Sequence, residues 1–123
     1  LRRDPLILLD GAHNLDAAEA LCGNIRKWPL SHLTAVVGMM QDKNCQEMLY
    51  LLASVAERIR TVDINYPRAA TANALAEQAK AYCPDTAPLG NASQAAQWIL
   101  EQQTPVLICG SFYLAGEIRS YFI

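Results

Sequence analysis

The sequence predicts an α/β fold, a three-layer α/β/α sandwich with a doubly wound, mostly parallel sheet. Short continuous apolar runs alternate with stretches in which apolar residues recur every three or four positions. Continuous apolar runs are typical of strands buried on both faces, as in a parallel sheet. The three- and four-residue spacing is typical of helices with one buried face. Because strand and helix alternate to the end of the chain, right-handed crossovers favour a Rossmann-like arrangement.

Five strands and five helices are expected. The strands cover residues 6–9, 33–37, 59–64, 86–89 and 105–109. The helices are expected after residue 14 as far as 28, after 44 through 56, after 71 as far as 82, after 91 or 93 through 100, and after 111 through 122. Pro29 ends the first helix, and Thr71 is the expected cap of the third. No internal repeat or low-complexity linker interrupts the series.

Composition narrows the class of protein. The chain has 123 residues, of which 52% are hydrophobic and 18% charged, so it is long and apolar enough for one domain with its own core. The net charge of −2 argues against a nucleic-acid or anionic-membrane partner. No apolar run approaches the roughly 18 residues of a spanning helix, and no secretory signal is recognisable. We expect a cytoplasmic domain cut from a longer chain.

The cysteines and histidines indicate no metal site within this chain. There are four cysteines and two histidines, and no two cysteines have CxxC spacing. We therefore expect reduced, buried thiols that act as small hydrophobic side chains.

Polar residues follow the expected strands and are the candidate site. Ligands of such sheets bind outside the carboxyl ends of the strands. The candidates are Asp10, His13 and Asn14 after the first strand, Asp42 and Lys43 after the second, Arg68 after the third, and Ser111 after the last. This is more polar chemistry than a purely structural edge needs.

Each candidate after the first strand has a functional and a structural interpretation. A carboxylate such as Asp10 can bind the hydroxyl groups of a ribose, and His13 can stack on a base or donate to a phosphate. Both residues can equally belong to a network of turn and cap hydrogen bonds. Asn14 stands at the start of a helix, where an asparagine also serves as the N-cap.

The remaining candidates are similarly open. Asp42 and Lys43 either contact a ligand or are only a solvated pair of charges in a loop. Arg68 can hold a carboxylate through two hydrogen bonds or extend into water. Gly110 and Ser111 precede a helix, where they form either a nest for an anion or a small turn with a serine cap.

Three well-known motifs are absent. The chain has no GxxxxGK[ST] phosphate loop, no GxGxxG after its first strand and no GxSxG. It therefore carries no triphosphate cradle of its own, and a dinucleotide role is disfavoured. We therefore expect this chain to form only one side of an active site.

Four segments resemble one family. Residues 7–14, Ile-Leu-Leu-Asp-Gly-Ala-His-Asn, resemble the DGAHN motif of folylpolyglutamate synthase/dihydrofolate synthase, in the Mur ligase superfamily. Residues 37–43 resemble that family's glycine-to-Asp-Lys loop, 66–69 its Pro-Arg-Ala segment and 109–114 its terminal Gly-Ser-Phe-Tyr-Leu motif. The resemblance covers nearly the whole chain and corresponds to the C-terminal domain of those enzymes. Leu15 and Asn44 depart from the family's usual proline and aspartate.

The resemblance implies an ATP-dependent amide ligase. Such enzymes convert the carboxylate of dihydropteroate or a folate to an acyl phosphate, which the amine of L-glutamate attacks. ATP and Mg²⁺ are the implied cofactors, with the phosphate loop and the metal ligands in an upstream ATPase domain of the same chain. Residues 1–123 would then be a single glutamate ligase domain that closes over ATP and is inactive alone.

The resemblance also implies roles for the candidates. Asp10 would contact the ribose of ATP, with His13 beside the nucleotide and Asn14 shaping that loop. Asp42, Lys43, Arg68 and Ser111 would face the interdomain cleft and bind glutamate or phosphate. The equivalent domain of a cell-wall Mur ligase and a stand-alone Rossmann-like binding module are the alternatives, and Gly11 favours the folate branch over the first.

Overall fold

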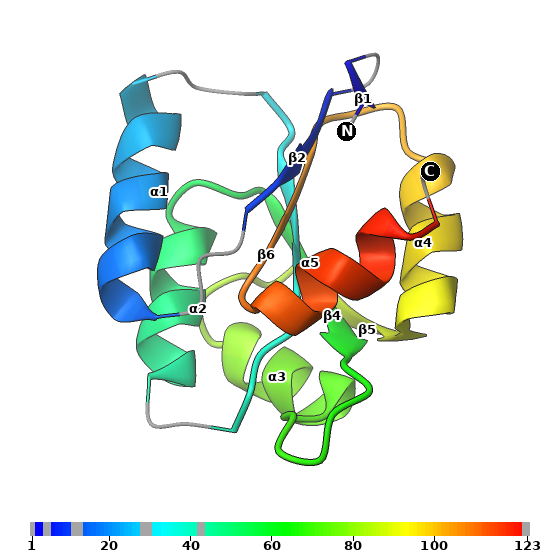
Figure 1. Ribbon diagram of the computed structural model, residues 1–123. Helices are drawn as coiled ribbons and strands as arrows, with labels where there is room; N and C mark the ends of the chain where they lie inside the picture. The colour runs from blue at the N-terminus through cyan, green and yellow to red at the C-terminus, as the bar shows by residue number, and fades with distance from the viewer. Residues whose placement is uncertain (1, 4–5, 11–13, 28–30, 42–43, 122–123) are drawn as a thin grey trace.

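The computed structural model describes residues 2–3, 6–10, 14–27, 31–41 and 44–121. Its strands are β1 (Arg2–Arg3), β2 (Leu6–Leu9), β3 (Thr34–Val37), β4 (Arg58–Asp63), β5 (Thr86–Asn91) and β6 (Val106–Cys109). Its helices are α1 (Leu15–Lys27), α2 (Cys45–Ala53), α3 (Ala72–Ala79), α4 (Ala92–Leu100) and α5 (Phe112–Arg119). The strands form one sheet in the order β1-β2-β6-β3-β4-β5 (Figure 1).

The sheet is parallel except at one edge, which confirms the predicted α/β class. β2, β6, β3, β4 and β5 pair in parallel, and only β1 pairs antiparallel, with β2. The sequence did not predict β1, because two residues are too few to show a periodicity. β6 lies between β2 and β3, so the winding direction of the chain reverses at this point of the sheet. Such a reversal is where ligands bind in open α/β sheets.

The helices cover both faces of the sheet, as predicted (Figure 1). One core joins α1, α2 and α3 to one face of the sheet and includes Val37 and Cys109. The other core joins α4 and α5 to the opposite face and includes Val36 and Ile108. Because neighbouring residues of a strand point to opposite faces, β2, β3, β4 and β6 each contribute to both cores. This explains the continuous apolar runs of β2 and β6.

Three helices are shorter than predicted. α2 ends at Ala53, not at residue 56. The hydroxyl of the next residue, Ser54, donates to the carbonyl of Leu51, and the chain continues as a turn. α3 ends at Ala79, not at residue 82, and Tyr82 lies in the following turn. The apolar spacing continues past the last helical residue because a turn also points side chains toward the core. α5 ends at Arg119, not at residue 122, and Ser120 and Tyr121 lie in the turn that follows. The expected end of the first helix, at residue 28, lies outside the described residues.

The predicted helix starts are confirmed where they can be compared. Thr71 Oγ1 accepts a hydrogen bond from the backbone N–H of Ala74 at 3.0 Å. Of the two starts considered for α4, Asn91 is the observed cap, and it forms a reciprocal capping box with Gln94. All four cysteines are buried free thiols, as expected. Within the described ranges, no helix has the length and hydrophobicity that crossing a bilayer requires.

Candidate functional site

The loops after β2, β6 and β3 begin side by side at the carboxyl end of the sheet. The backbone N–H of Asp10 donates to the carbonyl of Ile108 at 2.9 Å. The backbone N–H of Gly38 donates to the carbonyl of Cys109 at 3.3 Å. These bonds continue the sheet ladder by one residue beyond the strands. The segments that contain Asp10, Gly38 and Gly110 are therefore held at fixed positions relative to one another.

The loop after β3 is joined to the loop after β4. The N–H of Gln41 donates to the carbonyl of Arg68 at 2.6 Å, and the N–H of Ala70 donates to the carbonyl of Met39 at 2.9 Å. Met40 and Ala69 form an isolated antiparallel bridge between these bonds. The second and third of the four motif segments thus pair with each other.

A pair of tyrosines joins the third motif segment to the fourth. The rings of Tyr66 and Tyr113 lie 4.2 Å apart between centroids, and both residues are exposed. A hydrogen bond with the Tyr66 side chain raises the pKa of Tyr113 above its ordinary value. The sequence predicts no role for this pair. The signal was an aromatic residue next to each of two polar motifs, but only the fold shows that the two rings meet.

Two glycines allow the loops to approach closely. A Cβ on Gly110 would lie 2.5 Å from the carbonyl oxygen of Gly38, and Gly110 has a φ of +107°. A Cβ on Gly38 would lie 2.9 Å from Ile64 and 3.0 Å from Leu114. Any larger residue at Gly110 would therefore separate the ends of β3 and β6 and move the start of α5.

Ser111 and Asn14 both cap helices at this edge. Ser111 is buried, and its Oγ accepts from the backbone N–H of Tyr113 at 3.0 Å. Asn14 is exposed, and its Oδ1 accepts from the backbone N–H of Ala17 at 2.8 Å. The structural interpretation of both residues is confirmed. Their predicted ligand contacts stay predictions.

Asp10 lies at the end of β2 and is half-buried. Its carboxylate is close enough to the last residue of β6 to contribute to the raised pKa of Cys109, after burial and the nearby thiol of Cys22. Arg68 is exposed in the loop after β4. The structure thus brings Asp10, Asn14, Arg68 and Ser111 to one edge. His13, Asp42 and Lys43 lie outside the described residues.

A polar hollow of about 470 Å³ lies further along the same edge, at the ends of β4 and β5. Asp63, Asn91 and Glu117 line it, and the Glu117 carboxylate accepts from the backbone N–H of Asn65 at 3.1 Å. The sequence does not predict these three residues as site residues, because none follows a strand within a recognisable motif. Among the described residues, no group of three or more His, Cys, Asp or Glu side chains could hold a metal ion.

Comparison with known proteins identifies the family. The family model for the Mur ligase, glutamate ligase domain, matches residues 1–112. The dihydrofolate synthase/folylpolyglutamate synthase of Escherichia coli strain K12 is 32% identical over 124 aligned positions, which cover 93% of this chain and 27% of that protein.

Solved structures agree in fold over almost the whole chain. E. coli FolC in complex with DHPP and ADP has a TM-score of 0.88 at 28% identity, over 99% of this chain and 30% of that one. Mycobacterium tuberculosis folylpolyglutamate synthase, complexed with ADP and AMPPCP, has a TM-score of 0.86 at 25% identity, over 98% and 30%. The chain therefore spans less than a third of the length of these relatives. The family match, the fold and the four joined motif segments together show that the chain belongs to the Mur ligase family of glutamate ligase domains.

Proposed function

We propose that this chain is the C-terminal glutamate ligase domain of a longer cytoplasmic enzyme that joins L-glutamate to dihydropteroate, to folates, or to both, at the expense of ATP. The observation that carries the proposal is the joining of four separate motif segments at the carboxyl edge of the sheet. The related E. coli and M. tuberculosis enzymes are named for this activity or were solved with ADP. This supports a nucleotide at the equivalent edge here.

The proposed reaction has two steps. The carboxylate of the pteroate or folate attacks the terminal phosphorus of ATP, which forms an acyl phosphate and releases ADP. The amine of L-glutamate then attacks the acyl carbon, an amide forms, and inorganic phosphate leaves with the loss of a proton from nitrogen. Because water would hydrolyse the acyl phosphate, the site must close and align the amine before the second step.

The chain's own residues would bind and orient the reactants. We assign Asp10 to the ribose hydroxyl groups and His13 to the nucleotide. Asp42, Lys43 and Arg68 would bind glutamate or a phosphate. Asn14 and Ser111 keep the first turns of α1 and α5 in place, and the positive ends of these helix dipoles favour an anion at this edge. Mg²⁺, held by an upstream ATPase domain, would neutralise charge on the phosphates.

The substitution Asp10→Asn in the intact enzyme tests the site. Loss of a charge-assisted hydrogen bond to the ribose should weaken ATP binding by roughly 1.5–3 kcal/mol. The measurement is the Kd for ATP by titration calorimetry and the KM for ATP in steady-state assays. Asp16→Asn is the matched control, because Asp16 is exposed in the first turn of α1 and its loss changes the net charge equally. An unchanged ATP affinity in Asp10→Asn would remove Asp10 from the site.

The division of labour has its own test. Sequencing the reading frame upstream of residue 1 should reveal a phosphate-loop motif. The 123-residue chain alone should show no turnover of ATP with glutamate and pteroate or folate. Turnover by this chain without an upstream domain would contradict the proposal.

A further inference from the structure

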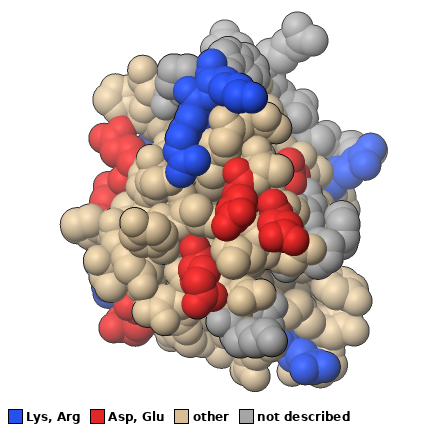
Figure 2. Space-filling view, turned by 90° about the vertical axis from the view of Figure 1, so that its left-hand side faces the viewer, with Lys and Arg blue, Asp and Glu red and all other residues tan. Residues whose placement is uncertain are grey.

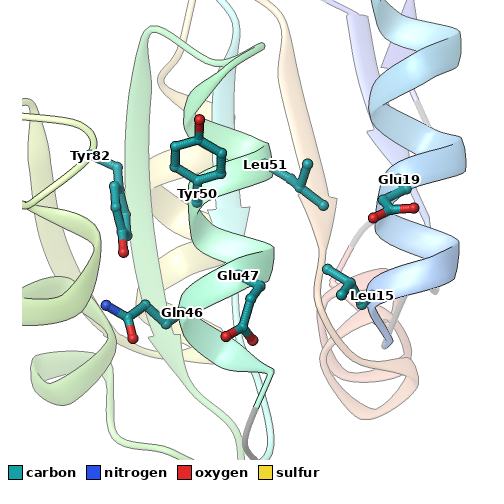
Figure 3. Close-up of a pocket in the computed structure, with 7 residues that line it drawn as sticks. All are labelled: Leu15, Glu19, Gln46, Glu47, Tyr50, Leu51 and Tyr82. Atoms are coloured by element: carbon teal, nitrogen blue, oxygen red, sulfur yellow. The ribbon is translucent and has the colours of Figure 1, made fainter.

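A groove on the outer surface of the molecule lies outside the four motif segments. It has a volume of about 360 Å³ and lies between α1 and α2, extending to Tyr82 in the turn after α3 (Figure 3). None of its lining residues belongs to the proposed ligase site. The groove therefore needs an explanation of its own.

The floor of the groove is apolar. Leu15 of α1 and Leu51 of α2 are partly buried and pack against the core beneath them. In Figure 3 Leu51 projects from α2 toward α1, and Glu19 projects from α1 toward α2. An apolar floor below a carboxylate suits a side chain with a long aliphatic stem and a charged end.

Two carboxylates border the groove and have no cationic partner among the described residues. Glu19 and Glu47 are exposed, and within the described ranges neither forms an ion pair. The basic residues of this face, Arg26 and Lys27, are in the last turn of α1, and Arg26 already donates to Ser54 Oγ at 2.8 Å. Figure 2 looks onto this side of the molecule and shows acidic side chains near its middle, below a group of basic ones.

Two tyrosines extend the groove toward α3. Tyr50 is 60% exposed and meets Tyr82 edge to face, with centroids 5.3 Å apart. Exposed tyrosines of this kind are enriched at protein interfaces, where the ring packs and the hydroxyl stays in water. A ring face beside carboxylates also attracts a guanidinium or an ammonium group.

We propose that this groove is the docking site for a basic segment of a partner protein. An arginine or lysine of that segment places its aliphatic stem on Leu15 and Leu51 and its cation between Glu19 and Glu47, with Tyr50 packing alongside. A second copy of this chain fits less well. Its basic residues on this face lie at the far end of α1, and its net charge has the same sign as the groove.

The test uses the 123-residue chain and a defined probe. The probe is a short fluorescein-labelled peptide of arginine, leucine and alanine, and its counterpart carries glutamate in place of arginine. Fluorescence anisotropy should show binding of the arginine peptide alone. The double variant Glu19→Gln/Glu47→Gln should weaken binding by roughly tenfold, since two partly exposed ion pairs are lost. Tyr50→Ala should weaken it by a few-fold without affecting folding, because the ring is mostly exposed.

The matched control is Glu77→Gln/Glu101→Gln, which removes the same charge from exposed positions on α3 and at the end of α4. This variant should bind the peptide as the unmodified chain does. Equal losses in the two double variants would mean that only net charge matters and would overturn the proposal, as would the absence of binding. Chemical-shift changes of backbone amides should map to α1 and α2. Self-association of the chain that the groove variant abolishes would assign the groove to a second copy and overturn the partner assignment.

Discussion

The two ends of the parallel sheet are built with different chemistry. At the amino end, polar side chains of different strands and of the segments just before them bond to one another. The pairs are His32 with Glu57 at 2.7 Å, Arg58 with Thr104 at 2.9 Å and Arg60 with Asp85 at 2.9 Å. At the carboxyl end, polar side chains bond to backbone N–H groups instead. Asn14, Asp63, Thr71, Asn91 and Ser111 all accept in this way.

This difference separates a structural edge from an edge available to a ligand. A side-chain pair occupies polar groups of both partners, so little remains for a bound molecule. A cap occupies one oxygen and fixes the first turn of a helix, while the other N–H groups of that turn stay available. Because the helices that follow β2, β4, β5 and β6 all begin at the carboxyl end, their positive dipole ends gather there. The carboxyl edge is thus both rigid and favourable to anions.

The largest expected effect comes from breaking the rigidity of the carboxyl edge. Gly110→Ala introduces a Cβ at 2.5 Å from the carbonyl oxygen of Gly38 and a side chain at a φ of +107°. We expect the free energy of unfolding to fall by about 3 kcal/mol or more. Urea denaturation followed by circular dichroism measures it.

A glycine in a helix provides the control. A Cβ on Gly116 of α5 would meet nothing within 4 Å. Gly116→Ala should therefore stabilise the chain by up to about 1 kcal/mol through helix propensity. A small, similar effect of both substitutions would show that the loops at the carboxyl edge do not need their close approach.

The next largest effect is expected from the buried thiol at the end of β6, and it shows whether water is excluded there. Cys109 is the last residue of β6, and burial raises the pKa of its thiol above the ordinary value of 9.0. The unfolded chain loses this proton above pH 9 while the folded chain keeps it, so stability is retained below pH 9 and decreases as the pH rises further. The slope contributed by this thiol approaches about 1.4 kcal/mol per pH unit.

Unfolding in urea under reducing conditions between pH 8 and 10.5 measures that slope. Cys109→Ala should be less stable at every pH but should show a shallower decline, because one raised thiol is removed. Parallel curves for the two proteins would mean that water reaches the end of β6.

The sequence predicted the framework well and the contacts between loops poorly. Local sequence patterns located five strands, and the caps Thr71 and Asn91 located two helix starts, because these signals depend on neighbouring residues alone. The Met40–Ala69 bridge and the Tyr66–Tyr113 pair depend on which strands become neighbours, which no local pattern contains. The same limit applies to the site. The position of Asp10, Asn14, Arg68 and Ser111 after the expected strands predicted that they share one edge of the sheet. Only the structure shows that Asn14 and Ser111 use their side chains as helix caps.

A smaller effect is expected from removing one cap of the carboxyl edge. Ser111→Ala loses the hydrogen bond to the N–H of Tyr113 and should lower the free energy of unfolding by about 1 kcal/mol. Ser120→Ala is the control, since Ser120 is exposed at the other end of α5 and should cost under about 0.5 kcal/mol. Urea denaturation of both variants gives the comparison. Equal losses would mean that the cap at Ser111 contributes nothing special to this edge.

The smallest effect is expected at the amino edge, from the hydrogen-bonded pair of His32 and Glu57, which is an ion pair when the imidazole is protonated. The side chains of His32 and Glu57 are 67% and 56% exposed, so water and salt screen the pair despite its 2.7 Å separation. Glu57→Gln should lower the free energy of unfolding by at most about 0.5 kcal/mol, and 1 M NaCl should reduce the difference further. Urea titrations at low and high salt measure it. If Glu57→Gln costs more than Ser111→Ala, the paired edge is the firmer one. Exposed side-chain pairs would then stabilise the chain more than helix caps do, which is the opposite of what we expect.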